Sequence, residues 1–378
     1  MRTVRAAVIG TGFMGSTHAE ALRRIPGVEI AAVASGRRER AEALAARFGV
    51  PTATDDWRRV VEDASIEIVH NCTPNDLHFE VNRAALEAGK HVVSEKPLTT
   101  TSGESAALVR LAEERGVVAA VNFNYRFYPL VQHARALVRR GEIGPVHLVH
   151  GHYVQDWLLF ETDYNWRLEV EAGGPSRALA DIGSHWMDLV QFVTGRRIER
   201  VFADLFTLHE TRQKPTSQAE TFRQGAGEAE PVRIGTEDGG TVLLQFEGGA
   251  RGAVTVSQVS AGRKNHQVFE IDGGRRALAW NQERPNELWI GRRDGPNEVL
   301  IKDPALLADE AQPYAHYPGG HPEGYPDGPK NLFANVYRAV REGVPAEPDY
   351  PTFADGHRAV RLVEAALESH AAQRWVDV

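Results

Sequence analysis

The sequence predicts an α/β protein: an N-terminal doubly wound parallel sheet, then an α+β domain with a large, mostly antiparallel open sheet. The chain has 378 residues, more than one hydrophobic core usually serves, so we expect two domains. Up to about residue 123, short β-branched runs alternate with helical patterns, which is typical of a parallel sheet. From about residue 145, apolar runs are separated by glycine pairs, which indicates antiparallel hairpins. We therefore place the domains at residues 1–123 and 124–378.

The first domain is expected to alternate strands and helices. Val4–Ile9 has the apolar, β-branched composition of a buried strand, and the helical pattern after it ends at Pro26 and Gly27. The later expected strands are Val28–Ala34, Ile66–Asn71, His91–Ser94 and Val117–Asn122, and the expected helices include His18–Arg24 and Arg38–Phe48.

The second domain is expected to contain two hairpins, each closed by consecutive glycines. The first joins Thr241–Phe246 to Ala253–Val259, and the second joins Val268–Ile271 to Ala277–Trp280. Two stretches with few large apolar residues or many Pro and Gly are expected to be long loops, and two later stretches have helical spacing. The loops are Thr211–Pro231 and Asp303–Pro329, and the helices are Asn331–Arg341 and Thr352–Ala372.

Composition narrows the classes of function. The 43 Lys and Arg against 51 Asp and Glu give a formal charge of −8, which argues against nucleic acid or an anionic membrane as the main partner. The single cysteine, Cys72, excludes an internal disulfide and indicates a reducing compartment. The N-terminus has no signal-like apolar segment, and no run of about 18 apolar residues occurs. We therefore expect a soluble cytoplasmic protein with no membrane span and no metal site.

A glycine-rich motif lies between the first expected strand and a helix. Its first glycine allows a tight turn, its second leaves bare backbone for a pyrophosphate, and its third lets helix and strand pack closely. The helix offers N–H groups and a favourable dipole to the phosphates. This setting predicts a Rossmann domain that binds a nicotinamide dinucleotide, the alternative being a glycine-rich turn in another kind of α/β protein. The residues expected to contact the cofactor here are Gly10, Thr11, Gly12, Phe13, Met14 and Gly15.

The end of the second strand bears on the choice of cofactor. The acidic residue that usually holds the ribose 2′-hydroxyl, about 20 positions on, is missing. Ser35, Arg37 and Arg38 stand there instead, and a hydroxyl with two guanidiniums suits a 2′-phosphate, which favours NADP over NAD. The alternative is that both arginines only solvate the start of the next helix.

Two further loops follow buried strands, at the carboxyl ends where ligands of open α/β sheets bind. In the second loop Lys96 lies between Glu95 and Pro97, and its ammonium could donate to a substrate oxygen and stabilise negative charge there. Taken alone, the first loop, Asn71–Asn75, is more often an ordinary turn, and a Glu-Lys pair such as that of the second loop is usually a solvated surface pair. The residues of this region expected to bind the cofactor are Cys72, Thr73, Pro74, Asn75, His78, Glu95, Lys96 and Asn122.

A helical stretch after Gly173 and Gly174 carries a histidine between two acids. Asp181, His185 and Asp188 are spaced i, i+4 and i+7, which puts them on one helical face. A histidine can take the proton from a hydroxyl as its carbon loses hydride, and a carboxylate one turn away can orient the ring. The alternative is a capped helix with a local ion pair.

Together these motifs resemble the Gfo/Idh/MocA oxidoreductase family, and the resemblance covers nearly the whole chain. It implies that Lys96 donates to the reacting oxygen, that His185 is the acid/base and that Asp181 assists it. It also implies a homodimer or homotetramer built through the C-terminal sheet. The motifs that carry it are Gly10–Gly15, then Glu95-Lys96-Pro97, then Gly173-Gly174 with Asp181–His185.

A finer similarity is to levoglucosan-type sugar dehydrogenases, through Asn122–Arg126, Gln155–Trp157 and Trp166-Arg167. It implies that Trp166 and Arg167 approach the nicotinamide. Two features depart from that group: the loop at Ser35 does not look NAD-selective, and the segment Gly320–Tyr325 is locally distinctive, so the sugar could differ. The residues expected to bind substrate are Lys96, Tyr125, Gln155, Asp156, Arg167, Asp181, His185, His321 and Tyr325.

These expectations describe an NAD(P)-dependent enzyme that transfers hydride between a nicotinamide and a hydroxyl or keto carbon of a sugar or cyclic polyol. Two rivals are an NAD-dependent glycosidase that oxidises its sugar only transiently and a non-catalytic dinucleotide sensor. A sensor need not keep Lys96, Asp181 and His185, so their presence argues against it. The same residues do not separate the two enzymes.

Overall fold

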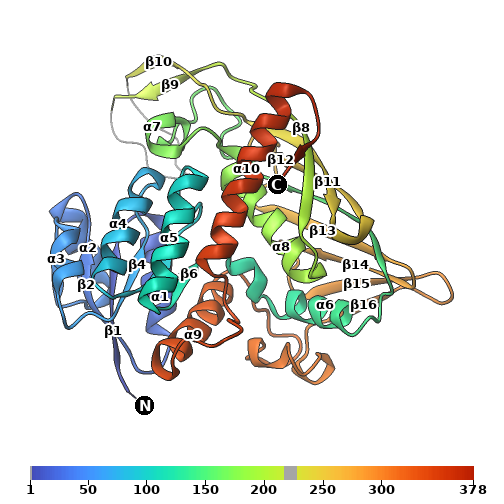
Figure 1. The fold of residues 1–378 in the computed structure, drawn as a ribbon, viewed down its shortest axis with the longest axis horizontal. Helices are drawn as coiled ribbons and strands as arrows, with labels where there is room; N and C mark the ends of the chain where they lie inside the picture. The colour runs from blue at the N-terminus through green and yellow to red at the C-terminus, as the bar shows by residue number, and fades with distance from the viewer. Residues whose placement is uncertain (1, 217–227) are drawn as a thin grey trace. The chain divides into compact units, whose positions relative to one another are not determined.

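The computed structural model describes residues 2–216 and 228–378, which form two compact units (Figure 1). The first unit contains residues 1–124 and 325–360, and the second contains residues 125–324 and 361–378. The sequence assigned residues 325–360 to the second domain. They belong to the first unit because helix α9 (Asp327–Glu342) packs against helix α1 (Phe13–Arg23), where Arg24 pairs with Asp327 at 2.5 Å.

Six parallel strands make up the sheet described in the first unit, in the order β3-β2-β1-β4-β5-β6. Because the order reverses between β1 and β4, the loops after these two strands meet at the same edge, which is the ligand-binding position of such sheets. The strands are β1 (Val4–Ile9), β2 (Val28–Ala34), β3 (Thr52–Thr54), β4 (Ile68–Asn71), β5 (His91–Ser94) and β6 (Ala119–Val121). The helices between them are α1, α2 (Arg38–Phe48), α3 (Trp57–Glu62), α4 (Asn75–Glu87) and α5 (Ser102–Arg115).

The predicted strands of this unit are confirmed, and their sequences explain why. β1 and β4 lie in the centre of the sheet with helices on both faces, so all their residues except Arg5 are buried. Most of them are apolar, and the polar ones at the end of β4 are His70 and Asn71. Helix α1 begins at Phe13, five residues before the predicted start, so its first turn lies inside the glycine-rich motif.

The second unit contains a nine-stranded sheet among its described residues, in the order β16-β15-β14-β13-β7-β12-β11-β8-β17. Only the pair β7–β12 is parallel, so the expected mostly antiparallel sheet is confirmed. The strands are β7 (Val146–Val154), β8 (Ile198–Phe206), β11 (Gly239–Phe246), β12 (Arg251–Ser257), β13 (His266–Gly273), β14 (Arg276–Asn281), β15 (Glu287–Arg292), β16 (Glu298–Ile301) and β17 (Val376–Asp377).

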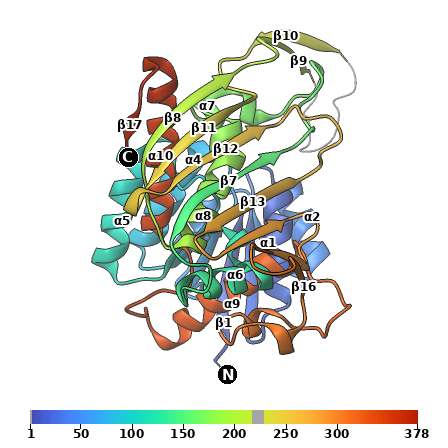
Figure 2. The ribbon, with the colours of Figure 1, turned by 90° about the vertical axis from the view of Figure 1, so that its right-hand side faces the viewer.

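Helices pack on one face of this sheet. Figure 2 shows β8, β11, β12, β7 and β13 in front of helix α8. Buried side chains of α6, α8 and the last part of α10 join the inward residues of the strands in one hydrophobic core. The helices are α6 (Pro129–Arg139), α7 (Val170–Gly173), α8 (Ser184–Thr194) and α10 (Phe353–Ala372), and a π-helical turn, Leu179–Gly183, precedes α8.

Both predicted hairpins are present, but the predicted loops need correction. The stretch Thr211–Pro231 begins in strand β9 (Thr211–Pro215) and ends in strand β10 (Ala229–Arg233), which pair with each other; residues 217–227 lie outside the described part. This ribbon is largely exposed and polar, so its strands lack the apolar alternation that marks a half-buried strand. The second predicted loop contains two 3₁₀ turns, Pro304–Leu306 and Gln312–Tyr314, and the start of α9. None of the described helices is long and apolar enough to cross a membrane.

Candidate active site

The glycine-rich turn has the geometry that its sequence predicts. Gly10 has a φ of +105°, and a Cβ there would collide with the carbonyl oxygen of Cys72. A Cβ on Gly15 would collide with the carbonyl oxygen of Gly10, so helix and strand pack too closely for a side chain. Around Gly12, by contrast, a Cβ would meet nothing within 4 Å. The turn therefore leaves open space beside bare backbone at the start of α1, which fits a pyrophosphate.

The two arginines after β2 differ in their surroundings. Arg38 is tied to its own helix by Glu42 at 3.0 Å and lies 3.9 Å from Asp55. Arg37 is exposed, and no ion pair joins its side chain to another described residue. Ser35 lies beside the glycine-rich turn, with its hydroxyl 2.9 Å from that of Thr11. Of the two exposed guanidiniums, that of Arg38 is already paired with a carboxylate of its own helix.

The loop after β4 is held by side chains of its own neighbourhood. Asn71 accepts hydrogen bonds from the amide and the hydroxyl of Thr73, the latter at 2.7 Å. His78 on α4 lies 3.0 Å from the carbonyl oxygen of Thr73 and 2.6 Å from that of Pro97. Both ring nitrogens of His78 thus face backbone carbonyls, and neither faces a ligand. This differs from the cofactor contact predicted for His78, whose position instead links the loops after β4 and β5.

Cys72, Pro74 and Asn75 complete this loop. Cys72 is buried, and burial together with the charge of Glu95 raises the pKa of its thiol well above the ordinary value, so the thiol stays neutral. Pro74 is the N-cap of α4, and Asn75 is the first residue of that helix. The loop therefore presents a helix N-terminus at the edge of the sheet where β4 ends.

Glu95 lies buried at the end of β5 and keeps its charge. Its Oε1 accepts hydrogen bonds from His18, at 2.9 Å, and from Asn122, at 2.6 Å. Burial alone would raise the pKa of Glu95, but these hydrogen bonds and the charge of Lys96 lower it to about 2. Glu95 is therefore a carboxylate enclosed by the protein, and its neighbour Lys96 donates its backbone N–H to Oε2 at 3.3 Å.

Asn122 offers a group that a cofactor could use. Its side chain is 1% exposed, and its Oδ1 is buried without a hydrogen-bond partner among the described residues. Such an acceptor is costly unless something donates to it. A carboxamide N–H, as found in nicotinamide, would satisfy it.

Tyr325 lies against the glycine-rich turn. Its ring stacks with that of Phe13 at a centroid distance of 6.3 Å, and its hydroxyl lies 3.6 Å from the sulfur of Met14. The sequence predicted a substrate contact for Tyr325, whereas these neighbours are residues of the predicted cofactor site.

His185 and Asp181 come from consecutive turns in the second unit. Asp181 lies on the π-helical turn and His185 in the first turn of α8, where its side chain is nine-tenths buried. Asp181 accepts a hydrogen bond from Gln258 at 2.8 Å, and the guanidinium of Arg167 lies 3.6 Å from its other oxygen. The ring of Tyr125 meets that of His185 edge to face at 4.9 Å. A carboxyl group with one hydrogen-bond donor and a guanidinium beside it thus lies one turn before a histidine.

Asp188, the third member of the predicted helical face, has a different partner. Both of its oxygens accept hydrogen bonds from Arg126, one of them at 2.8 Å. The side chains of both residues are almost fully buried. This bidentate pair fixes α8 to the segment before α6, which is a structural task.

Gln258 was not anticipated from the sequence, yet it is firmly placed. Its Oε1 accepts from Arg177 at 2.9 Å while its amide donates to Asp181. Arg177 in turn pairs with Asp238, which also pairs with Arg212 at 2.7 Å, all three fully buried. A buried network of charges therefore lies behind the carboxylate of Asp181.

A second network surrounds Tyr125. Its hydroxyl lies 2.7 Å from that of Tyr153 and accepts from Asn265 at 3.1 Å. Asn265 accepts in turn from Tyr153 at 2.6 Å and from Gln155 at 2.9 Å. Tyr153 and Asn265 were missed. Tyr153 lies two residues before Gln155, so the alternation of a strand could have indicated it, whereas Asn265 comes from a loop more than a hundred positions away.

Asp156 and His321, two further predicted substrate residues, have partners outside these networks, whereas Arg167 lies beside Asp181. Asp156 accepts from Lys264 at 2.7 Å and from the amide of Gly262, so it holds a loop. Arg167 stacks over the ring of Trp166 at 4.4 Å. His321 is exposed, and its carbonyl accepts from the buried Lys302 at 3.0 Å. The structure does not join His321 to the described neighbours of His185.

Potential metal ligands gather elsewhere. Among the described residues, one group of three, His150, Glu270 and Asp272, has ligand atoms within 4.8 Å of one another. These residues lie on β7 and β13 and point away from the hydrophobic core. The group therefore lies on the opposite face of the sheet from Tyr153.

The fold and the turn define a nicotinamide-dependent oxidoreductase with a Rossmann domain, and comparisons with known proteins agree. Residues 4–123 match the family described as "Oxidoreductase family, NAD-binding Rossmann fold", and residues 131–279 match the "GFO/IDH/MocA C-terminal domain". The chain belongs to the Gfo/Idh/MocA oxidoreductase family.

Relatives cover the chain from end to end. Levoglucosan dehydrogenase of Pseudarthrobacter phenanthrenivorans is 32% identical over 100% of this chain and 99% of its own length. A solved structure of levoglucosan dehydrogenase with NADH and L-sorbose has a TM-score of 0.90 at 30% identity, covering 100% of this chain and 99% of the other. An inositol dehydrogenase homolog from Azotobacter vinelandii, solved with NADH and myo-inositol, has a TM-score of 0.88 at 29% identity and covers 100% and 98%.

Proposed function

We propose that this oxidoreductase transfers a hydride between a nicotinamide cofactor and a hydroxyl or keto carbon of a sugar or cyclic polyol. The observation that carries the proposal is the group formed by Asp181, His185 and the network around Tyr125. A histidine beside an oriented carboxylate suits proton transfer, and neighbouring hydroxyls and amides suit a ligand with several hydroxyls. The relatives named above bind such compounds, which supports the same substrate class here.

Three side chains of this protein would assist the hydride transfer. His185 would take the proton from the reacting hydroxyl during oxidation and return it during reduction. Asp181, held by Gln258 and near Arg167, would stabilise the protonated ring. Lys96 would donate to the reacting oxygen and stabilise the charge that develops on it. The bound nicotinamide supplies or accepts the hydride.

The cofactor itself fits the first unit. The open backbone at Gly12 fits a pyrophosphate, and the buried Oδ1 of Asn122 can accept from a carboxamide. We propose NADP as the preferred cofactor, because Arg37 is exposed beside Ser35 at the end of β2, where a 2′-phosphate would lie. Tyr325 is then a cofactor residue, because its neighbours are Phe13 and Met14.

The experiment is a screen of monosaccharides, inositols and anhydrosugars with NAD⁺ and NADP⁺, following absorbance and product together. A dehydrogenase forms reduced cofactor and oxidised sugar in equal amounts. Cleavage of a glycoside without net reduction of cofactor would favour the glycosidase alternative. Tight cofactor binding with no turnover of any compound would favour a sensor.

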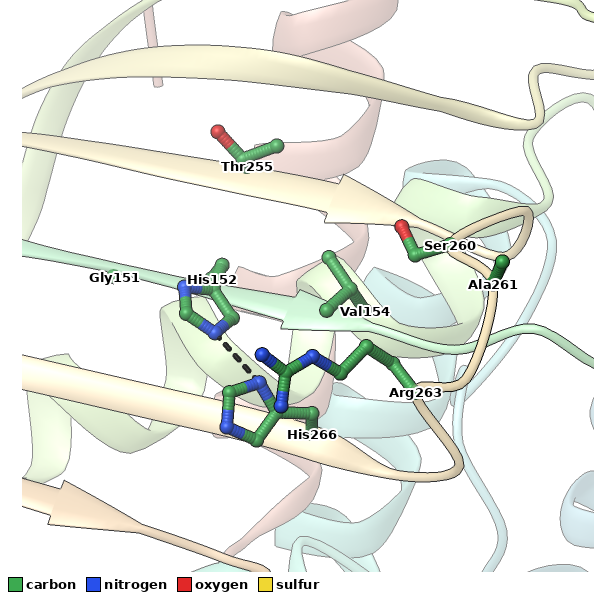
Figure 3. Close-up of a pocket in the computed structure, with 8 residues that line it drawn as sticks. All are labelled: Gly151, His152, Val154, Thr255, Ser260, Ala261, Arg263 and His266. Carbon is green, nitrogen blue, oxygen red and sulfur yellow. Dashed lines mark hydrogen bonds between the residues drawn. The ribbon is translucent and has the colours of Figure 1, made fainter.

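We also propose that two copies associate through the open face of the nine-stranded sheet. Leu148, Leu243 and Val299 lie on strands of this face and are 38–54% exposed. Exposed apolar groups spread over neighbouring strands are typical of interfaces. A shallow polar pocket interrupts them, where His152 bonds to His266 at 2.9 Å beside Arg263 (Figure 3).

Light scattering tests this association. Wild type should have at least twice the mass of one chain, and Leu243→Lys should lower it. Leu306→Lys is the control, because Leu306 is 61% exposed but lies outside the sheet. A wild type with the mass of one chain would exclude the interface.

The single, buried Cys72 also supports the proposal that the protein works in the reducing cytoplasm.

A further inference from the structure

A row of hydrogen-bonded side chains crosses the interior of the first unit. The hydroxyl of Tyr337, on α9, lies 3.0 Å from Nε2 of His70, on β4. Nδ1 of His70 lies 2.9 Å from Nδ1 of His18, on α1, and Nε2 of His18 lies 2.9 Å from Oε1 of Glu95. Tyr337, His70 and His18 are fully buried, and Glu95 is 6% exposed. The row ends at the residue that precedes Lys96.

The chemistry of these groups constrains the hydrogen bonds of the row. Glu95 is ionised and can only accept, so Nε2 of His18 carries a hydrogen. The two facing Nδ1 atoms of His18 and His70 share one hydrogen, so one ring donates there and the other accepts. The hydroxyl of Tyr337 can donate or accept, so it completes the row at Nε2 of His70 in either case. Two lone pairs or two N–H groups at the facing Nδ1 atoms would break the row.

The surroundings keep this arrangement dry and rigid. Phe333 on α9 meets the ring of His18 at 4.7 Å and that of His70 at 4.9 Å, both edge to face. Burial, with a smaller contribution from His18, lowers the pKa of His70 well below the ordinary value, so this ring is neutral. The titratable groups that face His70 are His18 from α1 and Tyr337 from α9. An apolar enclosure of this kind strengthens each hydrogen bond and penalises an unpaired one.

The far end of the row acts on Glu95. Its Oε1 receives His18 and Asn122 together, while Oε2 receives the backbone N–H of Lys96. The carboxylate is thus fixed at both oxygens. A Glu95 side chain that lost the His18 donor would gain freedom to turn, and the Lys96 backbone bonded to it would follow.

We propose that Tyr337 and His70 are positioning residues for the oxidoreduction: they fix the ring of His18, which holds Glu95 and thereby sets the position of Lys96. The inference rests on the proposed function only in taking Lys96 as the donor to the reacting oxygen. It assigns a role to a histidine pair that is fully buried inside the first unit. Neither His70 nor Tyr337 belongs to any of the motifs described above.

A pair of variants of matched size tests the proposal. Gln at position 70 can still donate an N–H to His18, whereas Leu cannot. We expect His70→Leu to lower kcat about tenfold, the scale of one buried hydrogen bond, with KM for the dinucleotide within about twofold of wild type. His70→Gln should keep most of kcat, and Tyr337→Phe should lose about threefold. A purely structural role predicts lower melting temperatures with kcat unchanged in the folded fraction of all three.

Nitrogen NMR of the ring nitrogens tests the tautomers in the unmodified protein, so the proposal stays testable if a variant fails to fold. We expect a protonated Nε2 on His18 and one hydrogen shared between the facing Nδ1 atoms of His18 and His70. An unprotonated Nε2 on His18, or equal kcat for His70→Leu and wild type, would overturn the proposal. Lys96→Met separates the failure of this proposal from the failure of the proposed function. If Lys96→Met keeps full activity, Lys96 is not the donor to the reacting oxygen. If Lys96→Met loses activity but the His70 and Tyr337 variants do not, only the positioning role of His70 and Tyr337 is wrong.

Discussion

In the first unit, the predicted cofactor residues stand within a few positions of strand ends, whereas the side chains around His185 in the second unit come from segments far apart in the chain. Gly10 follows β1 and Cys72 follows β4 without an intervening residue. Asp181, by contrast, is held by Gln258, and the hydroxyl of Tyr125 by Asn265. Parallel strands carry their ends to one edge of a sheet, so local motifs suffice there. A network across antiparallel strands depends on their register, which no short motif contains.

The two units should also respond differently to single substitutions. In the first unit, residues at strand ends are fixed by backbone groups and buried neighbours, so single replacements there should change cofactor affinity or the donor function of Lys96. In the second unit, replacements should change proton transfer and the binding of the sugar. A first-unit variant that changed only the KM for the sugar, or a second-unit variant that changed only cofactor affinity, would contradict this difference between the units.

The largest effect is expected at His185. His185→Ala should lower kcat by about 100- to 10,000-fold, the usual contribution of positioned acid–base catalysis, and Asp181→Asn should lose less. Oxidation by wild type should become faster as pH rises through the range in which histidine loses its proton. Steady-state kinetics and melting temperatures on the same preparations check this. Normal turnover in a stable His185→Ala protein would remove the residue from the mechanism.

His321→Ala is the matched control for that experiment. His321 is exposed, and its Nδ1 lies 3.2 Å from the carbonyl oxygen of Gly319 in its own loop. We expect kcat within about threefold of wild type, as for a surface change away from the chemistry. A marked rise in KM for the sugar would instead restore the predicted substrate contact.

Lys96 provides the largest effect expected in the first unit. Lys96→Met keeps much of the stem and removes the charge. We expect kcat to fall about 100-fold, the scale of one well-placed electrostatic donor, while the Kd for the dinucleotide stays near that of wild type. Fluorescence titration with reduced cofactor measures that Kd. Loss of cofactor affinity with unchanged kcat would make Lys96 a binding residue only.

Cofactor choice should depend on one arginine more than on the other. Arg37→Ala should weaken binding of NADPH about tenfold and leave that of NADH nearly unchanged, because a charged hydrogen bond to a phosphate is lost. Arg38→Ala should do less, since Arg38 is bonded to Glu42. A wild-type preference for NADH would show that the 2′-phosphate site does not exist.

Acid should weaken the first unit through its buried histidines. The pKa of His70 is lowered well below the ordinary value by burial, so the folded protein does not take up the proton that the unfolded chain binds near pH 6.5. The stability is therefore complete above that pH and decreases below it. Each such proton changes the free energy of unfolding by about 1.4 kcal/mol per pH unit.

In the His70→Gln variant, residue 70 no longer binds a proton in the unfolded chain. Between pH 6.5 and 5, which is roughly where free histidine becomes charged, its unfolding free energy should fall less steeply than that of wild type. Urea titrations at three pH values measure the two slopes. Glu95 contributes little in this window, because its pKa of about 2 means that its charge is lost only at lower pH. Parallel slopes would mean that His70 is protonated in the folded state.

The smallest effect is expected at Tyr325. Removing its ring by Tyr325→Ala should raise the Kd for the dinucleotide about threefold, the scale of one aromatic contact, and leave KM for the sugar unchanged. Tyr325→Phe should keep the stacking on Phe13. A change in sugar KM alone would return Tyr325 to the substrate site.

The sequence anticipated the parts of the site that depend on local geometry. The turn at Gly10 and Gly15 was predictable because only glycine fits where a Cβ would strike backbone. The role of His78 was not, because its two carbonyl partners come from different loops. The sequence predicts a loop in place of strands β9 and β10 for a related reason: these two strands pair with each other and bury little apolar surface. Pairing over long distances and polar pairing both lack a local signal.

The position of β7 has a consequence for how the chain acquires this structure. β7 is the first strand of its sheet along the chain, yet both of its neighbours, β12 and β13, follow it by about a hundred residues or more. During synthesis this apolar strand must therefore wait unpaired until most of the second unit has left the ribosome. Closing such long loops before any contact forms is slow, and a lone strand invites wrong partners. We expect the six-stranded sheet of the first unit, whose strands all precede β7, to form early, and the second unit to depend on chaperones for the interval between β7 and β13.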